Sequence, residues 1–292
     1  MFAVAGTVPI QNFPLVAGEV FLEDDNIRIR EMRVPVNRGT PALLAAAVKA
    51  CEALDQGAPF GYLVGDIGLG DGSRKLYEYM TGHLDKFDFQ SKHGTGLKAI
   101  TFHYLQPDVD WHNRVLFTVK EMKKAPILIA DAGFMYAAKM SGKAAEYDFF
   151  TPDVGELAFL ADEEAPHPFY TRGFVLHEEN RIPELIARTY KYKNGARCLL
   201  VKGKQDYVAD RHGIQATIDS PMEEAMEAMG GTGDTLTGIA TALIGTGMEV
   251  MKAAIIAARI NRLAGYYAKP TPATRVMEII KHIPTACNRL PV

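Results

Sequence analysis

The chain has only three cysteines, and their spacing fits neither a zinc site nor a disulfide framework. Cys51, Cys198 and Cys287 match no zinc-binding pattern, and three thiols are a poor basis for a disulfide framework. Cys51 falls in an expected helix, and Cys198 lies beside an expected strand. We therefore interpret the three cysteines as reduced thiols that pack in the interior.

Basic residues are not in excess either, because 32 Lys and Arg stand against 35 Asp and Glu, for a net charge of −3. Proteins that bind nucleic acids depend on a basic surface, so we expect no nucleic-acid partner. Charged residues interrupt the longest apolar runs, which disfavours a membrane-spanning helix. Residues 1–16 are apolar but lack the basic segment of a secretory signal and contain two prolines. We expect a cytoplasmic protein with no membrane partner.

Several common catalytic motifs are also missing. The sequence has no His-x-x-x-His pair for zinc, no Gly-x-Ser-x-Gly elbow and no phosphate loop ending in Gly-Lys-Ser/Thr. His112 is expected on an exposed helix face. The glycines at 68, 70 and 72 lack the full spacing of a dinucleotide fingerprint. Zinc enzymes, serine hydrolases and Rossmann dehydrogenases are therefore disfavoured.

What the sequence does contain is an alternation of short apolar segments with helical ones. Buried strands are expected at residues 60–64, 99–104, 126–130, 149–150 and 198–201. Helices are expected at residues 40–57, 73–80, 109–122, 134–140, 155–160 and 182–192, and from Thr235 and Glu249. In the first helix, Thr40 is placed to cap and Pro41 to occupy the first turn. This alternation predicts a mainly parallel sheet with helices on both faces.

Two hairpins accompany these elements. Residues 20–22 and 27–29 surround an Asp-Asp-Asn turn, and residues 207–209 and 214–218 form a second pair. The length suits one α/β domain over residues 1–292, with residues 1–32 as an N-terminal hairpin extension. Residues 161–180 are the least regular stretch; they form either a mobile flap or a surface connection, and we favour the connection.

Glycines are concentrated directly before an apolar helix, at Gly230, Gly231 and Gly233. A glycine-rich turn at a helix start directs several free amide groups at one point, where the helix dipole adds positive charge. Glycine suits such a turn because a side chain would block the close approach of a ligand. The segment predicts a binding site for phosphate groups.

Asp234 follows this turn, where a carboxylate would repel phosphate unless it had a function. One interpretation is a general base, which takes the proton from a substrate hydroxyl as its oxygen attacks a phosphoryl group. The alternative is that Asp234 only caps the helix, as aspartate often does.

Five other segments precede this one in the chain. They are Arg-Gly-Thr-Pro-Ala-Leu-Leu-Ala at 38–45, Gly-Asp-Ile-Gly-Leu-Gly at 65–70, Ile-Ala-Asp-Ala at 129–132, Thr-Pro-Asp-Val-Gly-Glu at 151–156 and Val-Lys-Gly at 201–203. In this order, the six segments resemble the ribokinase-like superfamily, and within it the ADP/ATP-dependent NAD(P)H-hydrate dehydratase family, also called carbohydrate kinase. The resemblance runs from about Arg33 to Pro284. It departs from the family at Asp153 and Asn261, where the family has histidine, at residues 66–67, where it has one proline, and in the acidic segment 221–226.

The resemblance implies a three-layer ribokinase-like α/β fold with Asp234 as the catalytic base. The implied phosphate- and nucleotide-binding residues are Gly230, Gly231, Thr232, Gly233, Lys202 and Gly203. The implied substrate-pocket residues are Gly68, Gly70 and Asp131. Asp153 and Glu156 would hold Mg²⁺, directly or through water. The alternative for this pair is a capping box at the start of a helix.

The resemblance also implies an activity, namely repair of NAD(P)H hydrate by dehydration coupled to ADP or ATP, with Mg²⁺. The ring hydroxyl of this small-molecule substrate would be phosphorylated and then eliminated. A second reading is an ATP-dependent kinase of a small alcohol, such as a sugar or a vitamin precursor, with the same base. A third is a nucleotide-binding protein without catalysis. We expect the chain to form a homo-oligomer.

Overall fold

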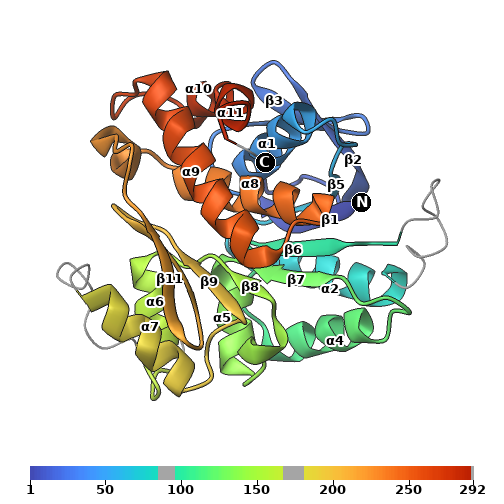
Figure 1. The fold of residues 1–292 in the computed structure, drawn as a ribbon. Coiled ribbons are helices and arrows are strands. Elements are labelled where there is room, and N and C mark those ends of the chain that lie inside the picture. The colour runs from blue at the N-terminus through green and yellow to red at the C-terminus, as the bar shows by residue number, and fades with distance from the viewer. Residues whose placement is uncertain (85–95, 167–180, 291–292) are drawn as a thin grey trace.

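The computed structural model describes residues 1–84, 96–166 and 181–290, and their strands join one sheet. The strand order is β11-β10-β9-β8-β7-β6-β1-β5-β2-β3-β4 (Figure 1). The strands are β1 (Phe2–Val8), β2 (Val16–Glu23), β3 (Asn26–Ile29), β4 (Met32–Pro35), β5 (Phe60–Gly65), β6 (Ala99–His103), β7 (Ile127–Ala130), β8 (Phe149–Phe150), β9 (Cys198–Val201), β10 (Asp206–Asp210) and β11 (Gly213–Ile218).

The centre of the sheet is parallel and its two edges are antiparallel. Strands β9, β8, β7, β6, β1 and β5 pair in parallel, in that order. The antiparallel strands β2, β3 and β4 extend one side, and β10 and β11 extend the other. Parallel strands end at a common edge, so the residues that follow β6, β7, β8 and β9 are brought together there.

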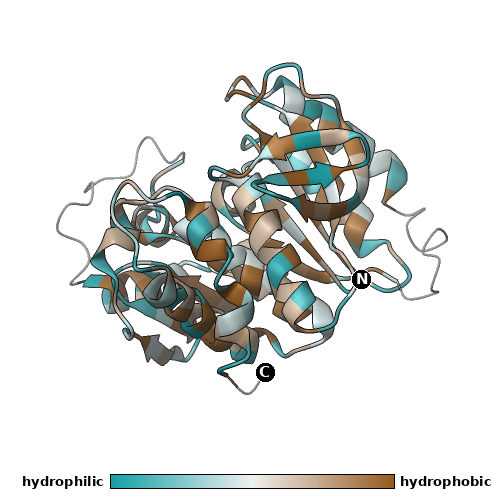
Figure 2. Cartoon of the chain, turned by 90° about the horizontal axis from the view of Figure 1, so that it is seen from above, coloured by the Kyte–Doolittle hydropathy of each residue, from teal (hydrophilic) through white to brown (hydrophobic). Residues whose placement is uncertain are grey.

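Helices cover both faces of the sheet, which confirms the three-layer prediction. One layer contains α1 (Thr40–Ala53), α8 (Thr232–Thr246), α9 (Val250–Ala268), α10 (Val276–Ile280) and α11 (Ile283–Cys287). The other contains α2 (Asp71–His83), α4 (Val109–Lys120), α5 (Ala132–Met140), α6 (Val154–Ala161) and α7 (Ile182–Lys191). Figure 1 shows the two layers on either side of the central strands. In Figure 2 the strands between them carry mostly hydrophobic residues.

Strand β1 is the main departure from the predicted architecture. All seven of its residues are buried, and it lies between β5 and β6 in the centre of the sheet. The assignment of residues 1–32 to a hairpin extension is therefore wrong for Phe2–Val8. Residues 2–8 form a mainly apolar run like those of the other buried strands, but the prolines at positions 9 and 14 made the start of the chain look irregular, so no strand was assigned there. The hairpin of β2 and β3 is confirmed, and β4 adds a third strand to it.

Helices α1 and α8 pack unusually closely. A Cβ atom at Gly238 in α8 would lie 2.2 Å from the carbonyl oxygen of Leu43 in α1, so only glycine fits there. This close packing sets the start of α1 beside the start of α8. Thr40, expected to cap α1, does not do so: Gly39 is the N-cap residue, and the Thr40 hydroxyl lies 3.1 Å from Nδ1 of His103.

His112 in α4 was expected on an exposed face, but it is fully buried. Its Nε2 lies 2.8 Å from the hydroxyl of Tyr147, in the layer formed by α2, α4 and α5. The prediction was wrong because α4 buries the face that carries His112, together with Val115, Leu116 and Val119. Burial lowers the pKa of His112 to about 4.

The sequence also led us to expect no membrane-spanning helix and an irregular segment at residues 161–180. Within the described stretches, no helix has the length and apolar character needed to cross a lipid bilayer. The irregular segment predicted at residues 161–180 begins at the end of α6, and its residues 167–180 lie outside the described residues.

Candidate active site

The glycine-rich turn leads directly into α8, as predicted. Its N-cap residue is Gly231, with φ of 101°, and no side chain caps the helix. The amide groups of the first residues therefore have no partner from within the helix or from a capping side chain. A Cβ at Gly231 would lie 3.1 Å from Cγ2 of Val276, so both the backbone angle and the packing favour glycine. This uncapped helix start can receive an anion.

Asp234 is the third residue of α8, and its buried carboxylate contacts other elements. Oδ2 accepts a 2.6 Å hydrogen bond from the amide of Gly39, before α1. Oδ1 lies 3.2 Å from Nε2 of His103, at the end of β6. The capping alternative is therefore wrong, because the carboxylate is held by two distant segments and the N-cap position belongs to Gly231.

The surroundings of Asp234 favour its ionised form. Burial alone would raise the pKa of this carboxyl group. The contacts with His103, the charge of Lys202 and the amide of Gly39 outweigh burial, and they hold the pKa below its ordinary value. Asp234 is therefore an anion at neutral pH, which is the state that can accept a proton.

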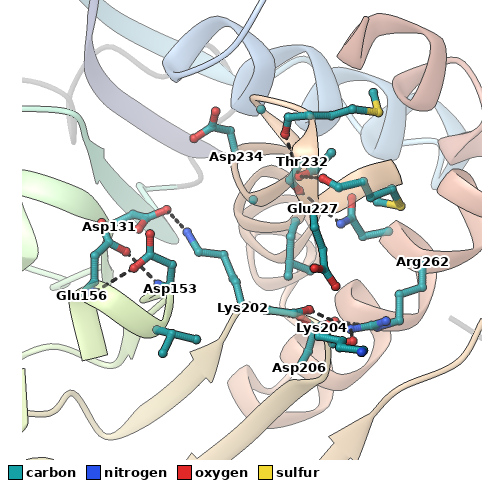
Figure 3. A pocket seen from close by; sticks show the side chains of 18 of the residues that line it. Asp131, Asp153, Glu156, Lys202, Lys204, Asp206, Glu227, Thr232, Asp234 and Arg262 are labelled. Carbon is teal, nitrogen blue, oxygen red and sulfur yellow. Dashed lines mark hydrogen bonds and ion pairs between the residues drawn. The ribbon is translucent and has the colours of Figure 1, made fainter. Parts of the chain in front are cut away.

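Lys202 and Asp131 form a second charged pair in the same place. Figure 3 shows Lys202 extending from the end of β9 toward Asp131, whose Oδ2 accepts a 2.8 Å hydrogen bond from Nζ. The same oxygen accepts from the hydroxyl of Thr237 in α8, at 2.9 Å. Burial lowers the pKa of Lys202, but Asp131, Glu156 and Asp234 act more strongly and raise it overall. Lys202 therefore stays positively charged.

These groups line one pocket of about 590 Å³. Of the predicted site residues, it brings together Gly231, Thr232, Gly233, Asp234, Asp131, Asp153, Glu156, Lys202 and Gly203. Gly230, Gly68 and Gly70 are not among its lining residues. The lining includes seven acidic and three basic side chains, so acidic groups outnumber basic groups in the pocket.

The loop that holds Gly68 and Gly70 is closed by its own aspartate. Oδ1 of Asp66 accepts from the amides of Gly68 and Gly70, and Oδ2 accepts from the amide and hydroxyl of Ser73. Burial raises the pKa of Asp66, but these bonds outweigh it and lower the pKa. The carboxylate fills the place that an anionic ligand would take at the start of α2.

Asp153 and Glu156 form the capping box that was considered as their alternative role. Oδ1 of Asp153 accepts from the amide of Glu156, and Oε2 of Glu156 accepts from the amide of Asp153. Burial, Asp153 and Asp131 raise the pKa of Glu156 to about 8, against the opposing charge of Lys202. Among the described residues, no group of three or more His, Cys, Asp or Glu side chains is arranged to hold a metal ion.

Sequence reasoning missed the residues that hold Asp234. His103 is fully buried, and it is a single histidine in an apolar strand, which matches no motif. Gly39 acts through its backbone amide, for which the sequence has no signal. Tyr104, which follows His103 and lines the pocket, has a φ of 54°, a conformation that is uncommon for a bulky residue. Of the three, only Gly39 lies in a segment that a motif marked, at residues 38–45.

Comparison with known proteins identifies the family. A family model described as NAD(P)H-hydrate dehydratase matches residues 105–285, more than half of the chain. The chain belongs to the NAD(P)H-hydrate dehydratase family. The match includes the turn at 151–156, Lys202 and Asp234. It begins after segments 38–45 and 65–70, so it does not cover that part of the resemblance.

Two relatives show how far the similarity reaches. An uncharacterized protein of Methanocaldococcus jannaschii is 38% identical over 245 residues, which cover 84% of this chain and 97% of that protein. The bifunctional NAD(P)H-hydrate repair enzyme Nnr of Pyrobaculum aerophilum is 28% identical over 178 residues. Those residues cover 60% of this chain and 32% of the repair enzyme, so the chain spans about a third of that relative.

Solved structures confirm the fold. A ribokinase-like superfamily protein from Enterococcus faecalis superposes with a TM-score of 0.56 at 17% identity, over 85% of this chain and 82% of that one. Pyridoxal kinase from Bacillus subtilis, solved as an ADP complex, gives a TM-score of 0.53 at 16% identity, over 88% of each chain. The fold is ribokinase-like, and the chain is an enzyme of the ribokinase-like or hydrate dehydratase kind.

Proposed function

We propose that the enzyme repairs NAD(P)H hydrate by phosphorylating its ring hydroxyl at the expense of ADP or ATP and then eliminating phosphate. The observation that carries this proposal is the ionised carboxylate of Asp234, which the Gly39 amide and His103 contact from two sides, beside the uncapped start of α8. That arrangement sets a proton acceptor next to a phosphate site, as phosphoryl transfer to a hydroxyl requires. Family membership supports NAD(P)H hydrate as the substrate.

The proposed reaction has two steps. Asp234 takes the proton of the substrate hydroxyl while its oxygen bonds to the terminal phosphorus, and the nucleotide leaves shortened by one phosphate. The C–O bond to the new phosphate group then breaks, phosphate leaves with the electron pair, and a proton is lost from the neighbouring ring carbon. The ring double bond is restored, so the products are NAD(P)H, phosphate and the shortened nucleotide.

The nucleotide would lie between two walls of the pocket. The amides of Thr232 and Gly233 would receive the phosphates, with the charge of Lys202 close by. Met222, Met226 and Met229 also line the pocket and offer apolar, adaptable side chains to a base. The Thr232 hydroxyl donates to the carbonyl oxygens of Met226 and Met229, which ties this wall to α8.

Asp153 and Glu156 are the residues that we propose to hold Mg²⁺. Their carboxylate oxygens are the ligand type that Mg²⁺ prefers, and the acidic surplus of the pocket supports a bound cation. Because both side chains also form the capping box, coordination through water fits them better than a full protein cage. The ion would neutralise phosphate charge when bound.

A kinase acting on a small alcohol is the second candidate. The fold shared with pyridoxal kinases, one solved with ADP and another from Staphylococcus aureus with AMP-PCP and pyridoxal, favours it as the alternative. The same Asp234 would serve as base, and the reaction would stop at the phosphate ester.

One assay separates the two candidates. Hydrated NADH is incubated with ADP or with ATP and Mg²⁺, and the return of NADH absorbance is followed. Dehydration predicts recovery of absorbance with release of phosphate. Phosphorylation of pyridoxal, sugars or other small alcohols without recovery from the hydrate would favour the kinase, and absence of both reactions would contradict the proposal.

We also propose that residues 1–292 act as one domain and assemble into a homo-oligomer. The single sheet of the described residues supports the first part. Light scattering of the purified enzyme tests the second, since one chain has a mass of 32.1 kDa. A particle of that mass would exclude the oligomer.

A further inference from the structure

His103 is the most completely enclosed titratable group near Asp234. Its side chain has no exposed surface, and it stands at the end of β6, in the centre of the sheet. Nε2 lies 3.2 Å from Oδ1 of Asp234 and 3.7 Å from Oδ2 of Asp131. Within the described part of the chain, this nitrogen has no conventional hydrogen-bond partner. A buried nitrogen without a hydrogen-bond partner needs an explanation, and we find it in the electrostatic attraction of the two carboxylates that it faces.

The other ring nitrogen fixes how the imidazole is turned. Nδ1 lies 3.1 Å from the hydroxyl of Thr40, in the first turn of α1. Room for this contact comes from Gly6 in β1, where a Cβ would lie 2.6 Å from both the Thr40 hydroxyl and the carbonyl oxygen of His103. The ring is therefore held from behind by Thr40, and Nε2 lies on the side of Asp234.

The two contacts of Asp234 come from outside the part of the chain that matches the family. His103 and Gly39 both precede residue 105, where the match begins, whereas Asp234 lies inside it. One carboxylate oxygen faces the amide and the other faces the imidazole. Together they leave the carboxylate little freedom to rotate, which a general base needs for good geometry.

We propose that His103 is a positioning residue, which holds Asp234 ionised and correctly turned toward the substrate hydroxyl. The inference rests on the proposed function, because it assigns a role in that same reaction. His103 is buried behind Asp234, so it acts through the carboxylate and does not touch the nucleotide. His103 from β6, Lys202 after β9 and Tyr104 interact electrostatically with Asp234, and Asp131 after β7 faces the same imidazole at 3.7 Å.

The direction of the effect follows from the electrostatics. Burial raises the pKa of Asp234, and the contacts with His103 are the strongest of those that lower it again. Removing the imidazole should raise that pKa, so Asp234 would be protonated, and inactive as a base, at a higher pH. The acid limb of the pH–rate profile should therefore move to higher pH.

The test compares His103→Leu, His103→Gln and His112→Gln. In His103→Leu we expect kcat to fall about 10- to 100-fold, the range for residues that orient a functional group, with the nucleotide KM unchanged. The acid limb of kcat/KM should shift to higher pH, and His103→Gln should restore part of both effects. His112→Gln removes an equally buried histidine outside the pocket, so it should leave the profile in place. An unmoved acid limb in His103→Leu would overturn the proposal.

A second measurement does not depend on turnover or on the folding of the leucine variant. The ¹⁵N chemical shift of His103 Nε2, assigned with His103→Gln, is compared between the wild type and Asp234→Asn. We expect the shift of His103 to change and that of His112 to stay. An unchanged His103 shift would overturn the coupling. A changed shift in an enzyme that converts neither hydrate nor alcohol would keep the coupling and reject the proposed function.

Discussion

At the scale of single residues, the motif singled out Asp234, and the structure shows what holds its carboxylate. The glycines before Asp234 pointed to it, and it lines the pocket. His103 and the Gly39 amide were not found, because their contacts with Asp234 span 131 and 195 residues of sequence. Short-range spacing contains no information on such contacts. Gly68 and Gly70 were expected at the substrate pocket from the family resemblance, and they do not line the pocket that contains Asp234.

The phosphate site can be tested at Gly233. A Cβ there would lie 3.4 Å from Cδ of Lys202, so a valine side chain would crowd this lysine and block the amides of the first turn. Gly233→Val should therefore abolish nucleotide binding, measured by calorimetry, while the circular dichroism spectrum is kept. Gly82→Val is the matched control, since nothing lies within 4 Å of a Cβ at that position in α2. Unchanged nucleotide affinity in Gly233→Val would contradict the anion site.

At the scale of elements, the regular alternation of apolar segments predicted the parallel sheet and both helix layers. β7, β8, β9, α5, α6 and α7 lie within a few residues of the predicted ranges. β1 escaped prediction because prolines follow it and made the start of the chain look irregular, although its apolar run resembles those of the other parallel strands. The capping box that we considered as an alternative to metal binding is present at the start of α6.

Whether α6 also serves Mg²⁺ is decided with Glu156→Gln. Glutamine can still accept the Asp153 amide, so the melting temperature should change little. If Glu156 serves the ion, the Mg²⁺ concentration for half-maximal activity should rise about tenfold or more. Glu249→Gln is the control, because Glu249 caps α9 by accepting from two amides and does not line the pocket. An unaltered Mg²⁺ requirement would mean that Glu156 serves only as part of the cap of α6. Loss of such a cap lowers folding stability by about 1 kcal/mol.

At the scale of the whole molecule, the hydrophobic cores on the two faces of the sheet differ in the size of their side chains. The layer of α1, α8 and α9 is rich in small residues, and its close packing aligns Gly39, His103 and Asp234. The opposite layer encloses aromatic side chains and His112. This division was not predictable from composition, because it depends on which face of each helix meets the sheet.

The buried His112 makes the stability of the molecule sensitive to acid. Its pKa in the folded state is about 4, whereas an exposed imidazole has a pKa near 6.5. The unfolded chain therefore binds a proton that the folded chain does not as pH falls from about 6.5 to about 4, and folding stability is lost in that window. Between pH 7 and pH 5 the loss should be about 2 kcal/mol, measured by urea unfolding.

The comparison with His112→Gln isolates this contribution. The glutamine variant loses contacts with Tyr147, so it should be less stable than the wild type at pH 7. Its further loss between pH 7 and pH 5 should be smaller by the same amount of about 2 kcal/mol. Equal losses in both proteins would show that His112 does not titrate in this way.

The central claim is that Asp234 is the base, and Asp234→Asn tests it most directly. Asparagine keeps the size and can still accept the Gly39 amide, but it cannot take the hydroxyl proton. Turnover of hydrated NADH should fall by ~10²–10⁴-fold, the usual contribution of a positioned base. Nucleotide affinity should hold or rise, because a negative charge near the phosphates is removed. Turnover close to that of the wild type would contradict the account.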